Sequence, residues 1–214
     1  MLRAIKNYWA FTKLGYRLVV FVVLPIVILL LGAFCIWAQI PIMVAMLLGY
    51  IYMPTVDIMV DNWLLGGFYA KNNSSLEYLQ SSNRFKTMIR DVVLVDTIRR
   101  FILYVGVYVI VLVAGMNHPE QLEGYRICSF LPMFCFVISQ AGVLVARHFM
   151  VWNQAYAVGA VLMLVEAVCL APLVDITEKY TWLVQGVLAV LAIAIGIIVV
   201  VYSMKKVRDS YYDK

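Results

Sequence analysis

The chain has 214 residues, of which 64% are hydrophobic and only 14% are charged, and its formal net charge is +5. Soluble domains carry about 25% charged residues, so this composition excludes an ordinary soluble protein and indicates an integral membrane protein. The seventeen lysines and arginines are spread between apolar stretches and form no basic domain, which argues against nucleic-acid binding. We therefore expect an all-α, polytopic membrane fold.

The first 17 residues are predicted to form an amphipathic helix at the membrane surface. At 100° per residue, four basic side chains fall within an arc of about 80°: Arg3, Lys6, Lys13 and Arg17. Such a helix lies among the lipid headgroups, with its cations directed toward anionic lipid. An ordinary positive flank of the first membrane span explains the same residues, and both interpretations stay open.

Six apolar stretches are long enough to cross a hydrocarbon layer of roughly 30 Å, which requires about 20 residues. We place them at 18–38, 41–61, 98–116, 125–146, 151–174 and 181–203. Each is expected to be a helix, because lipid offers no hydrogen-bond partner to an exposed backbone. The first stretch is too long for a cleavable signal sequence, whose apolar part has roughly 7–15 residues. Residues 18–214 then form one transmembrane domain, with a cytoplasmic segment at 62–100 and a short tail at 204–214.

Basic residues are distributed unequally between the two predicted sides of the membrane. The N-terminal segment, the 62–100 segment, Arg147 and the tail hold fifteen of the seventeen, whereas only Arg126 and Lys179 lie on the other side. Because positively charged loops remain in the cytoplasm, both termini and the 62–100 segment are predicted to be cytoplasmic. We expect a multi-pass protein of the cell membrane, of the bacterial plasma-membrane type.

The 62–100 segment contains a helical pattern close to its end. Apolar residues there are spaced for a helix that lies against the membrane or a neighbour: Met88, Ile89, Val92, Val93, Val95 and Ile98. Three basic residues precede or accompany this set, namely Arg84, Lys86 and Arg90. A helix that docks a partner and a solvated loop are both compatible with the pattern.

The order of residues between 57 and 100 carries a family resemblance. An acidic pair and a glycine are followed by Glu-Tyr-Leu and a basic cluster, and the matching residues are Asp57, Asp61, Gly66, Glu77, Tyr78, Leu79, Ser81, Arg84, Lys86 and Ile89. This arrangement resembles the type-2 ATP-binding-cassette (ABC) permease family, in which the segment often reads E-Y-L-x-S-L-P-x-S-R-x-x-I-V. The present chain has QSSNRF where Leu-Pro-x-Ser is usual. The number and layout of the six predicted spans are similar to the family as well.

The resemblance implies the membrane half of an ABC exporter, which forms a homo- or heterodimer with a second permease subunit and binds a separate ATPase subunit. It implies that the ATPase is contacted by Glu77, Tyr78, Leu79, Arg84, Lys86 and Arg90, with Arg147 in a second, smaller contact. ATP and Mg²⁺ would be bound by that partner, because this chain lacks the Gly-x4-Gly-Lys-Ser/Thr loop that holds phosphates. We therefore expect no enzyme activity and no bound cofactor in the chain itself.

Glu166 lies in the middle of the fifth predicted span. A charge at the centre of a span costs about 2.5–3.5 kcal/mol on insertion scales and usually faces protein or water. Glu166 is predicted to point inward, since its helix face is shared with small or apolar residues: Ala155, Gly159, Leu162 and Cys169. A carboxylate on the translocation path and a protonated or hydrogen-bonded packing residue both fit. Few charges lie within the spans, which favours an amphipathic or apolar cargo such as a peptide, an antibiotic or a lipid-like molecule.

Asp57 and Asp61 lie one helical turn apart at the end of the second predicted span. We expect them to pair with Lys71, Arg99 or Arg100 near the cytoplasmic surface, where exposed ion pairs contribute little stability. The two histidines lie on opposite predicted faces, so no histidine-based metal site is expected.

Two other function classes remain as alternatives. A six-span substrate-binding subunit of a vitamin importer has a similar length, although the short outer loops argue against an external pocket. A small membrane-embedded lipid enzyme would use Asp57 and Asp61 as a metal-binding pair, although the upstream Asp-Gly and Ala-Arg pattern of phosphatidyl transfer is missing.

Overall fold

The computed structural model describes residues 2–37, 53–61, 84–117, 120, 122–149 and 152–212. These ranges are nearly all helical, so the predicted all-α class is confirmed. In chain order the elements are α1 (Leu2–Phe11), α2 (Leu14–Leu18), the π-helical η1 (Val19–Val23), α3 (Leu24–Trp37), a helix at 53–61, α6 (Phe85–Asn117), α7 (Leu122–Cys128), α8 (Leu131–Phe149) and α9 (Trp152–Tyr212).

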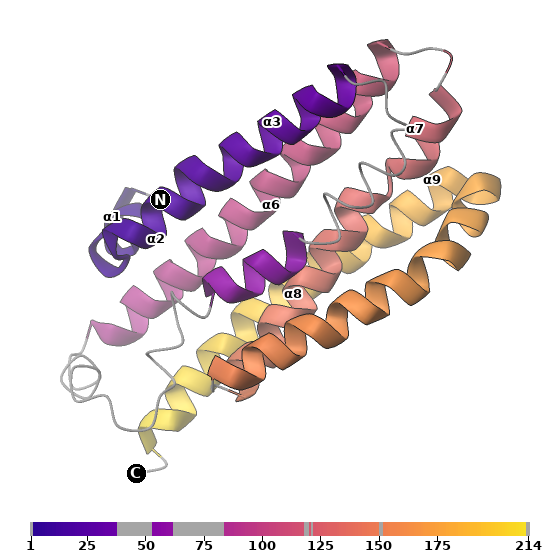
Figure 1. Cartoon of the computed structure of the whole chain (residues 1–214). Coiled ribbons are helices and arrows are strands. Elements are labelled where there is room, and N and C mark those ends of the chain that lie inside the picture. The colour runs from indigo at the N-terminus through magenta and orange to yellow at the C-terminus, as the bar shows by residue number, and fades with distance from the viewer. Residues whose placement is uncertain are drawn as a thin grey trace.

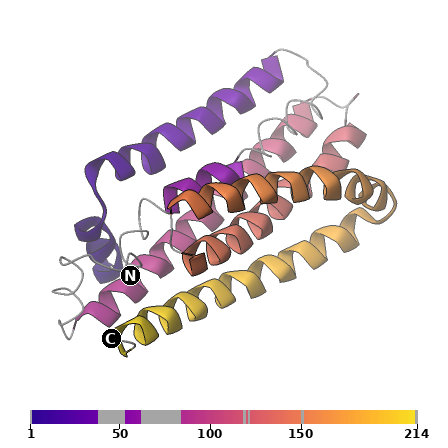
Figure 2. The same ribbon diagram turned by 60° about the horizontal axis from the view of Figure 1, so that its bottom comes forward.

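The long helices run side by side in one bundle, and both ends of the chain lie at the same end of it (Figures 1 and 2). Helix α6 is central, because it contacts α1, α3, α7, α8 and α9. Helix α9 is interrupted at Tyr180, whose φ of −132° and ψ of 47° are not helical. The chain reverses there, so the parts of α9 before and after Tyr180 lie antiparallel (Figure 2).

Three described helices are long and apolar enough to cross a membrane, namely Leu14–Phe34, Gly124–Val145 and Ile176–Lys205. They overlap the first, fourth and sixth predicted spans, and they are consistent with a membrane location. The third predicted span, 98–116, lies within α6, and the fifth, 151–174, lies largely within the first part of α9. Of the second predicted span, only 53–61 falls within the described residues. Six spans and the orientation of the bundle stay predictions.

The N-terminal segment is not one continuous helix, in contrast to the prediction for residues 1–17. Helix α1 ends at Phe11, and Lys13 is extended, with φ of −71° and ψ of 153°. The predicted arc of Arg3, Lys6, Lys13 and Arg17 requires one continuous helix from residue 1 to residue 17. Because the helix is interrupted after Phe11, this part of the prediction is wrong. The break has a local cause, because Arg17 turns back to donate hydrogen bonds to the carbonyl oxygens of Thr12 and Trp9 at the end of α1. Its guanidinium also lies 4.8 Å from the centre of the Trp9 ring.

A π-helical stretch, Val19–Val23, joins α2 to α3. The amide of Leu24 donates to the carbonyl of Val19, five residues earlier, instead of to the residue four before it. Pro25 follows and has no amide hydrogen, so an ordinary helical bond is already missing at this point. The wider turn accommodates that loss.

Glycines allow the 53–61 helix to lie close to α8 and α9. A Cβ atom at Gly142 of α8 would overlap the terminal methyl groups of both Ile58 and Leu162. A Cβ atom at Gly159 of α9 would lie 3.3 Å from the Cγ2 of Thr55. Small residues of this kind are what permits close helix approach within a membrane.

Candidate functional site: a buried ion-pair network

Five charged residues meet in the interior between the 53–61 helix and α6. Asp57 and Asp61 are four residues apart and therefore share one face of their helix. On α6, the charged residues Asp96, Arg99 and Arg100 share a face for the same reason. All five side chains are buried, and none is more than 9% exposed. Two charged helix faces are thus turned toward each other inside the protein.

Arg100 holds the centre of this network. Its Nη2 atom lies 2.6 Å from Oδ1 of Asp61 and 2.8 Å from Oδ2 of Asp96, and its Nε lies 3.8 Å from Oδ1 of Asp57. Arg99 acts in parallel, with its Nη2 at 3.1 Å from Oδ1 of Asp96 and 3.5 Å from Oδ1 of Asp57. Each arginine therefore bridges a carboxylate of its own helix to one of the 53–61 helix.

Hydrogen bonds extend the network to the N-terminal segment. The Tyr16 hydroxyl donates to Oδ1 of Asp96 at 3.0 Å, and it lies 2.9 Å from the Tyr8 hydroxyl. Nearer the start of α6, Nδ2 of Asn7 donates to Oδ2 of Asp91 at 2.7 Å. Burial, helped by the charge of Asp96, raises the pKa of Tyr8, which keeps its hydroxyl protonated as a hydrogen-bond donor. Polar contacts thus tie α1 and α2 to α6.

One further hydrogen bond reaches α8. The Ser139 hydroxyl donates to Oδ2 of Asp57 at 2.8 Å, and both residues are buried. Next to it in sequence, Gln140 is also fully buried, and neither polar atom of its amide has a hydrogen-bond partner among the described residues. The network therefore spans four segments of the chain: the N-terminal helices, the 53–61 helix, α6 and α8.

The charges of the network do not cancel completely, because three carboxylates face two guanidinium groups. Each guanidinium remains protonated in a protein, since arginine does not titrate in the ordinary range. The hydroxyls of Tyr16 and Ser139 donate to the carboxylates and so stabilise the surplus negative charge. Removing one member of a buried ion pair typically costs about 3–5 kcal/mol, because its partner is left as an uncompensated charge. The network consequently requires close alignment of its charged groups, and removing one member lowers the stability of the fold.

The predicted pairing of Asp57 and Asp61 with Arg99 and Arg100 is confirmed, whereas the predicted exposed setting of these pairs is wrong. The difference arises because the final residues of the 62–100 segment belong to a helix packed inside the bundle, not to a solvated interval. The other suggested partner, Lys71, lies outside the described residues.

Three sequence-predicted coupling residues lie at the beginning of α6 or just before it. Arg84, Lys86 and Arg90 are exposed, and the Arg90 guanidinium lies 3.4 Å from its neighbour Asp91. Glu77, Tyr78 and Leu79 lie outside the described residues, as does the glycine of the family pattern, Gly66. Arg147 belongs to the last turn of α8, and its side chain is not among those described.

Glu166 lies within the first part of α9, and its side chain is likewise outside the described set. Two residues predicted to share its helix face have described contacts. Gly159 is buried against Thr55, and Cys169 packs against a buried apolar cluster that includes Phe130 and Phe134. The inward direction of Glu166 itself and its two interpretations stay predictions.

Sequence reasoning missed Asp96, Tyr16 and Ser139 as members of the site. Asp96 was detectable, because an aspartate within an apolar helical pattern needs a partner, and two arginines follow it at spacings of three and four. Tyr16 and Ser139 carried no comparable signal, since their partners are 80 and 82 residues away in the sequence.

The carboxylates of the network are paired with guanidinium groups. Among the described residues, no group of three or more histidine, cysteine, aspartate or glutamate side chains is placed to hold a metal ion. Guanidinium groups lie between the three carboxylates, in the positions that a cation would take. Chemically, this arrangement can fix four chain segments relative to one another.

Comparison with protein-family models, with curated proteins and with solved structures found no match to this chain. The resemblance to type-2 ABC permeases therefore depends on the 57–100 pattern and on the layout of the predicted spans.

Proposed function

We propose that this chain is the permease subunit of an ABC exporter in a cell membrane. In this proposal the chain spans the membrane six times with both termini in the cytoplasm, and it pairs with a second permease subunit. A separate ATPase subunit binds ATP and Mg²⁺. The cargo is amphipathic or apolar, such as a peptide, an antibiotic or a lipid-like molecule.

The supporting observation is the continuity of α6. This single helix of 33 residues begins at Phe85, next to the exposed cations Arg84 and Lys86, and contains the buried arginines of the network in its middle part. A helix transmits displacement along its axis because its backbone is hydrogen-bonded at every turn. A partner that moved the beginning of α6 would thus move the network as well.

The network extends that movement to other segments. The 53–61 helix is joined to α6 through Asp57 and Asp61, and the N-terminal helices are joined through Tyr16. The predicted first three spans would consequently shift as one body against the rest of the dimer. For ATP to drive such a shift, the ATPase has to bind the two permease conformations with different affinities.

The alternatives receive less support. A metal-dependent lipid enzyme would require Asp57 and Asp61 to face a cation, but both carboxylates are committed to guanidinium groups. No specific observation favours a vitamin-binding importer subunit.

The test is co-purification of an ATPase with the full-length chain from its native membrane, followed by an assay of ATP hydrolysis by the purified complex. Reversing the three cations Arg84, Lys86 and Arg90 to glutamate is expected to abolish both. The matched control reverses three other exposed cations, Arg3, Lys6 and Lys13, which changes the net charge equally and lies on the same predicted side. This control should retain the ATPase.

Two results would contradict the proposal. One is a pure chain that carries no ATPase from membranes in which it is natively expressed. The other is equal loss of the ATPase in both triple variants, because the interaction would then reflect net charge and not the beginning of α6.

A further inference from the structure

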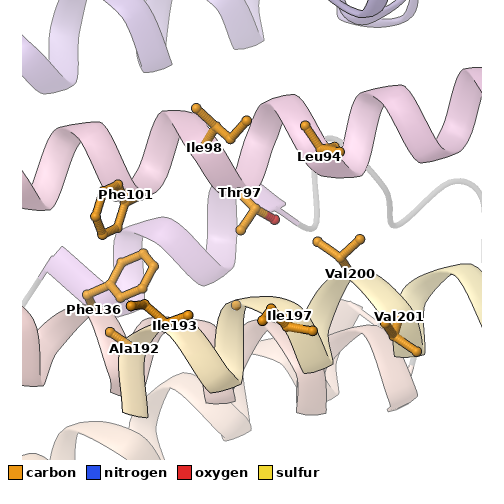
Figure 3. A pocket seen from close by; sticks show the side chains of 11 residues that line it. Leu94, Thr97, Ile98, Phe101, Phe136, Ala192, Ile193, Ile197, Val200 and Val201 are labelled. Carbon is orange, nitrogen blue, oxygen red and sulfur yellow. The ribbon is translucent and has the colours of Figure 1, made fainter. Parts of the chain in front are cut away.

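An open apolar groove of about 340 Å³ lies between α6 and the part of α9 that follows Tyr180. One wall runs from Leu94 to Phe101 on α6, and the other runs from Ala192 to Val201 on α9 (Figure 3). Phe136 of α8 closes one end, beside Phe101 and Ile193 (Figure 3). The groove is separate from the ion-pair network, although both involve α6.

The lining of the groove is suited to hydrocarbon. No charged side chain contributes to it, and its only hydroxyl, that of Thr97, donates to the carbonyl of Val93 within the same helix at 2.9 Å. Gly196 contributes no side chain, and a Cβ atom placed there would still be 4.0 Å from the Cγ2 of Thr97. An unbranched aliphatic chain can therefore enter without leaving a polar group unsatisfied.

The groove opens to the outside of the bundle. Along the α9 wall, the side chains of Ile193, Ile197 and Val201 are about 60% exposed. This wall belongs to the stretch Ile176–Lys205, which is long and apolar enough to cross a membrane. In a bilayer, the medium that faces such residues is the acyl chains of lipids.

Basic side chains flank one end of the groove. The two walls run antiparallel, with Leu94 opposite Val200 (Figure 3), so the beginning of α6 and the end of α9 lie together. Arg90 is one helical turn before Leu94, and Lys205 is one turn after Val201; both are exposed. A hydrocarbon-lined groove with two cations beyond one end is complementary to a lipid tail that is joined to an anionic headgroup.

The length of the groove matches one leaflet. At 1.5 Å per residue, the α6 wall is about 10 Å long and the α9 wall about 14 Å long. Half of a hydrocarbon core of roughly 30 Å is about 15 Å. A chain lying in the groove therefore stays within the leaflet whose headgroups are near Arg90 and Lys205.

We propose that this groove binds one acyl chain of an anionic phospholipid, whose phosphate is held by Arg90 and Lys205. The lipid lies along the seam between α6 and α9 and stabilises their contact from the outside. This site depends on a membrane location and does not require an ATPase, although Arg90 also belongs to the proposed ATPase contact.

The test reconstitutes the full-length chain in bilayers that contain phosphatidylglycerol with a photoactivatable group on one acyl chain. After illumination, the labelled positions are mapped by peptide mass spectrometry. Labels are expected on 94–101 and 193–201, at least fivefold more often than on the apolar surface of α3. Even labelling of all apolar surfaces would overturn the proposal, and this result requires no substitution.

Two substitutions on the same helix test whether the groove itself is required. Gly196→Leu fills the groove and is expected to remove its labels. Gly186→Leu is the matched control, because a Cβ atom there meets nothing within 4 Å, and it should leave labelling unchanged. Equal labelling in the two variants would contradict binding within the groove.

The headgroup is tested by native mass spectrometry of lipid retained in detergent. Replacing Arg90 and Lys205 separately by glutamine should weaken phosphatidylglycerol retention about fivefold each, as expected for one basic residue near a charged membrane surface. Lys179→Gln, an exposed cation before Tyr180 on the same helix, is the control. Equal retention of phosphatidylcholine and phosphatidylglycerol by the unmodified chain would refute the role of the two cations.

A second copy of the chain is the competing occupant. A cysteine at Ile197 would then form a disulfide between two chains in the bilayer, whereas a lipid-filled groove predicts no such product. Efficient cross-linking through this position would replace the lipid site with a protein interface.

Discussion

The 53–61 helix has two interfaces of opposite character. Toward α6 it presents Asp57 and Asp61, which are held by arginines in buried ion pairs. Toward α8 and α9 it presents Ile58 and Thr55, which fit against glycines. The first interface is charged and directional. The second is formed largely by apolar side chains and small residues, with one hydrogen bond from Ser139 of α8 to Asp57.

This difference indicates which contacts fix the structure and which allow movement. Charge-assisted hydrogen bonds impose a geometry, because guanidinium and carboxylate groups must align. Apolar contacts are not directional, so the apolar part of the second interface can shift without a polar group losing its partner. We infer that the 53–61 helix stays with α6, and that movement relative to α8 would require the Ser139–Asp57 hydrogen bond to break.

The largest expected effect comes from Arg100→Met, which leaves the buried carboxylates without their central cation. We expect the free energy of unfolding to fall by about 3–5 kcal/mol. The measurement is the denaturation midpoint of the chain in detergent micelles. Arg90→Met, at an exposed position of the same helix, should change stability by less than about 0.5 kcal/mol. A comparable loss in the two variants would mean that the network is not what keeps the interface together.

Tyr16→Phe tests the link between the N-terminal segment and α6. The change removes a hydrogen bond to Asp96 and leaves the Tyr8 hydroxyl without this partner, at an expected cost of about 1.5–3 kcal/mol. Thr97→Val provides the comparison, because the Thr97 hydroxyl bonds only to its own helix. Limited proteolysis should also cut the N-terminal segment faster in Tyr16→Phe. Unchanged cleavage would show that Tyr16 does not anchor this segment.

Gly142→Leu tests the apolar interface. The new side chain overlaps the space of Ile58 and Leu162, and overpacking of this kind costs about 1–3 kcal/mol. Gly106→Leu is the control, since a Cβ atom at Gly106 meets nothing within 4 Å. If transport can be assayed, Gly142→Leu should slow it more than its stability loss explains. Full transport by this variant would argue against movement at this interface.

Ser139→Ala has the smallest expected effect, about 1 kcal/mol, because Asp57 keeps both arginines as partners. It removes the hydrogen bond that joins the network to α8. If α8 moves relative to the network, this variant should alter the transport rate more than it alters the denaturation midpoint. If the transport rate and the denaturation midpoint change to the same extent, Ser139 contributes to stability and not to movement of α8.

The fold class was predictable from composition, because long apolar stretches in lipid can only be helices or closed barrels. The partners of Asp57 were also predictable, since few cations lie near the end of the second predicted span. Burial of these pairs was not predictable from a charge count. The burial arises because α6 does not begin at its apolar stretch but already at Phe85. Arg99 and Arg100 therefore lie within a helix that is packed inside the bundle.

The break after α1 was missed for a different physical reason. Helical spacing alone could not reveal it, because the cations of residues 1–17 fit one continuous helix equally well. The decisive interaction is Arg17 turning back onto the end of α1, and it involves backbone carbonyls that have no sequence signature. Likewise, Ser139 and Tyr16 are found only when distant segments are placed side by side.

The π-helical stretch at Val19–Val23 has a consequence for how this molecule tolerates insertions and deletions. It contains one residue more than an ordinary turn would need, so a chain shortened by one valine could continue as a regular helix. Because the wide turn absorbs the extra residue, the helix after it keeps the face that a regular helix without this valine would present. Gly32 now faces Ile110 so closely that a Cβ atom on it would lie 3.0 Å from the Cγ2 of that side chain. Deleting one valine of the stretch should therefore leave this glycine facing α6, whereas deleting one residue between Leu24 and Gly32 would turn it away by about 100°. The wide turn thus keeps the first apolar helix in register with its neighbour.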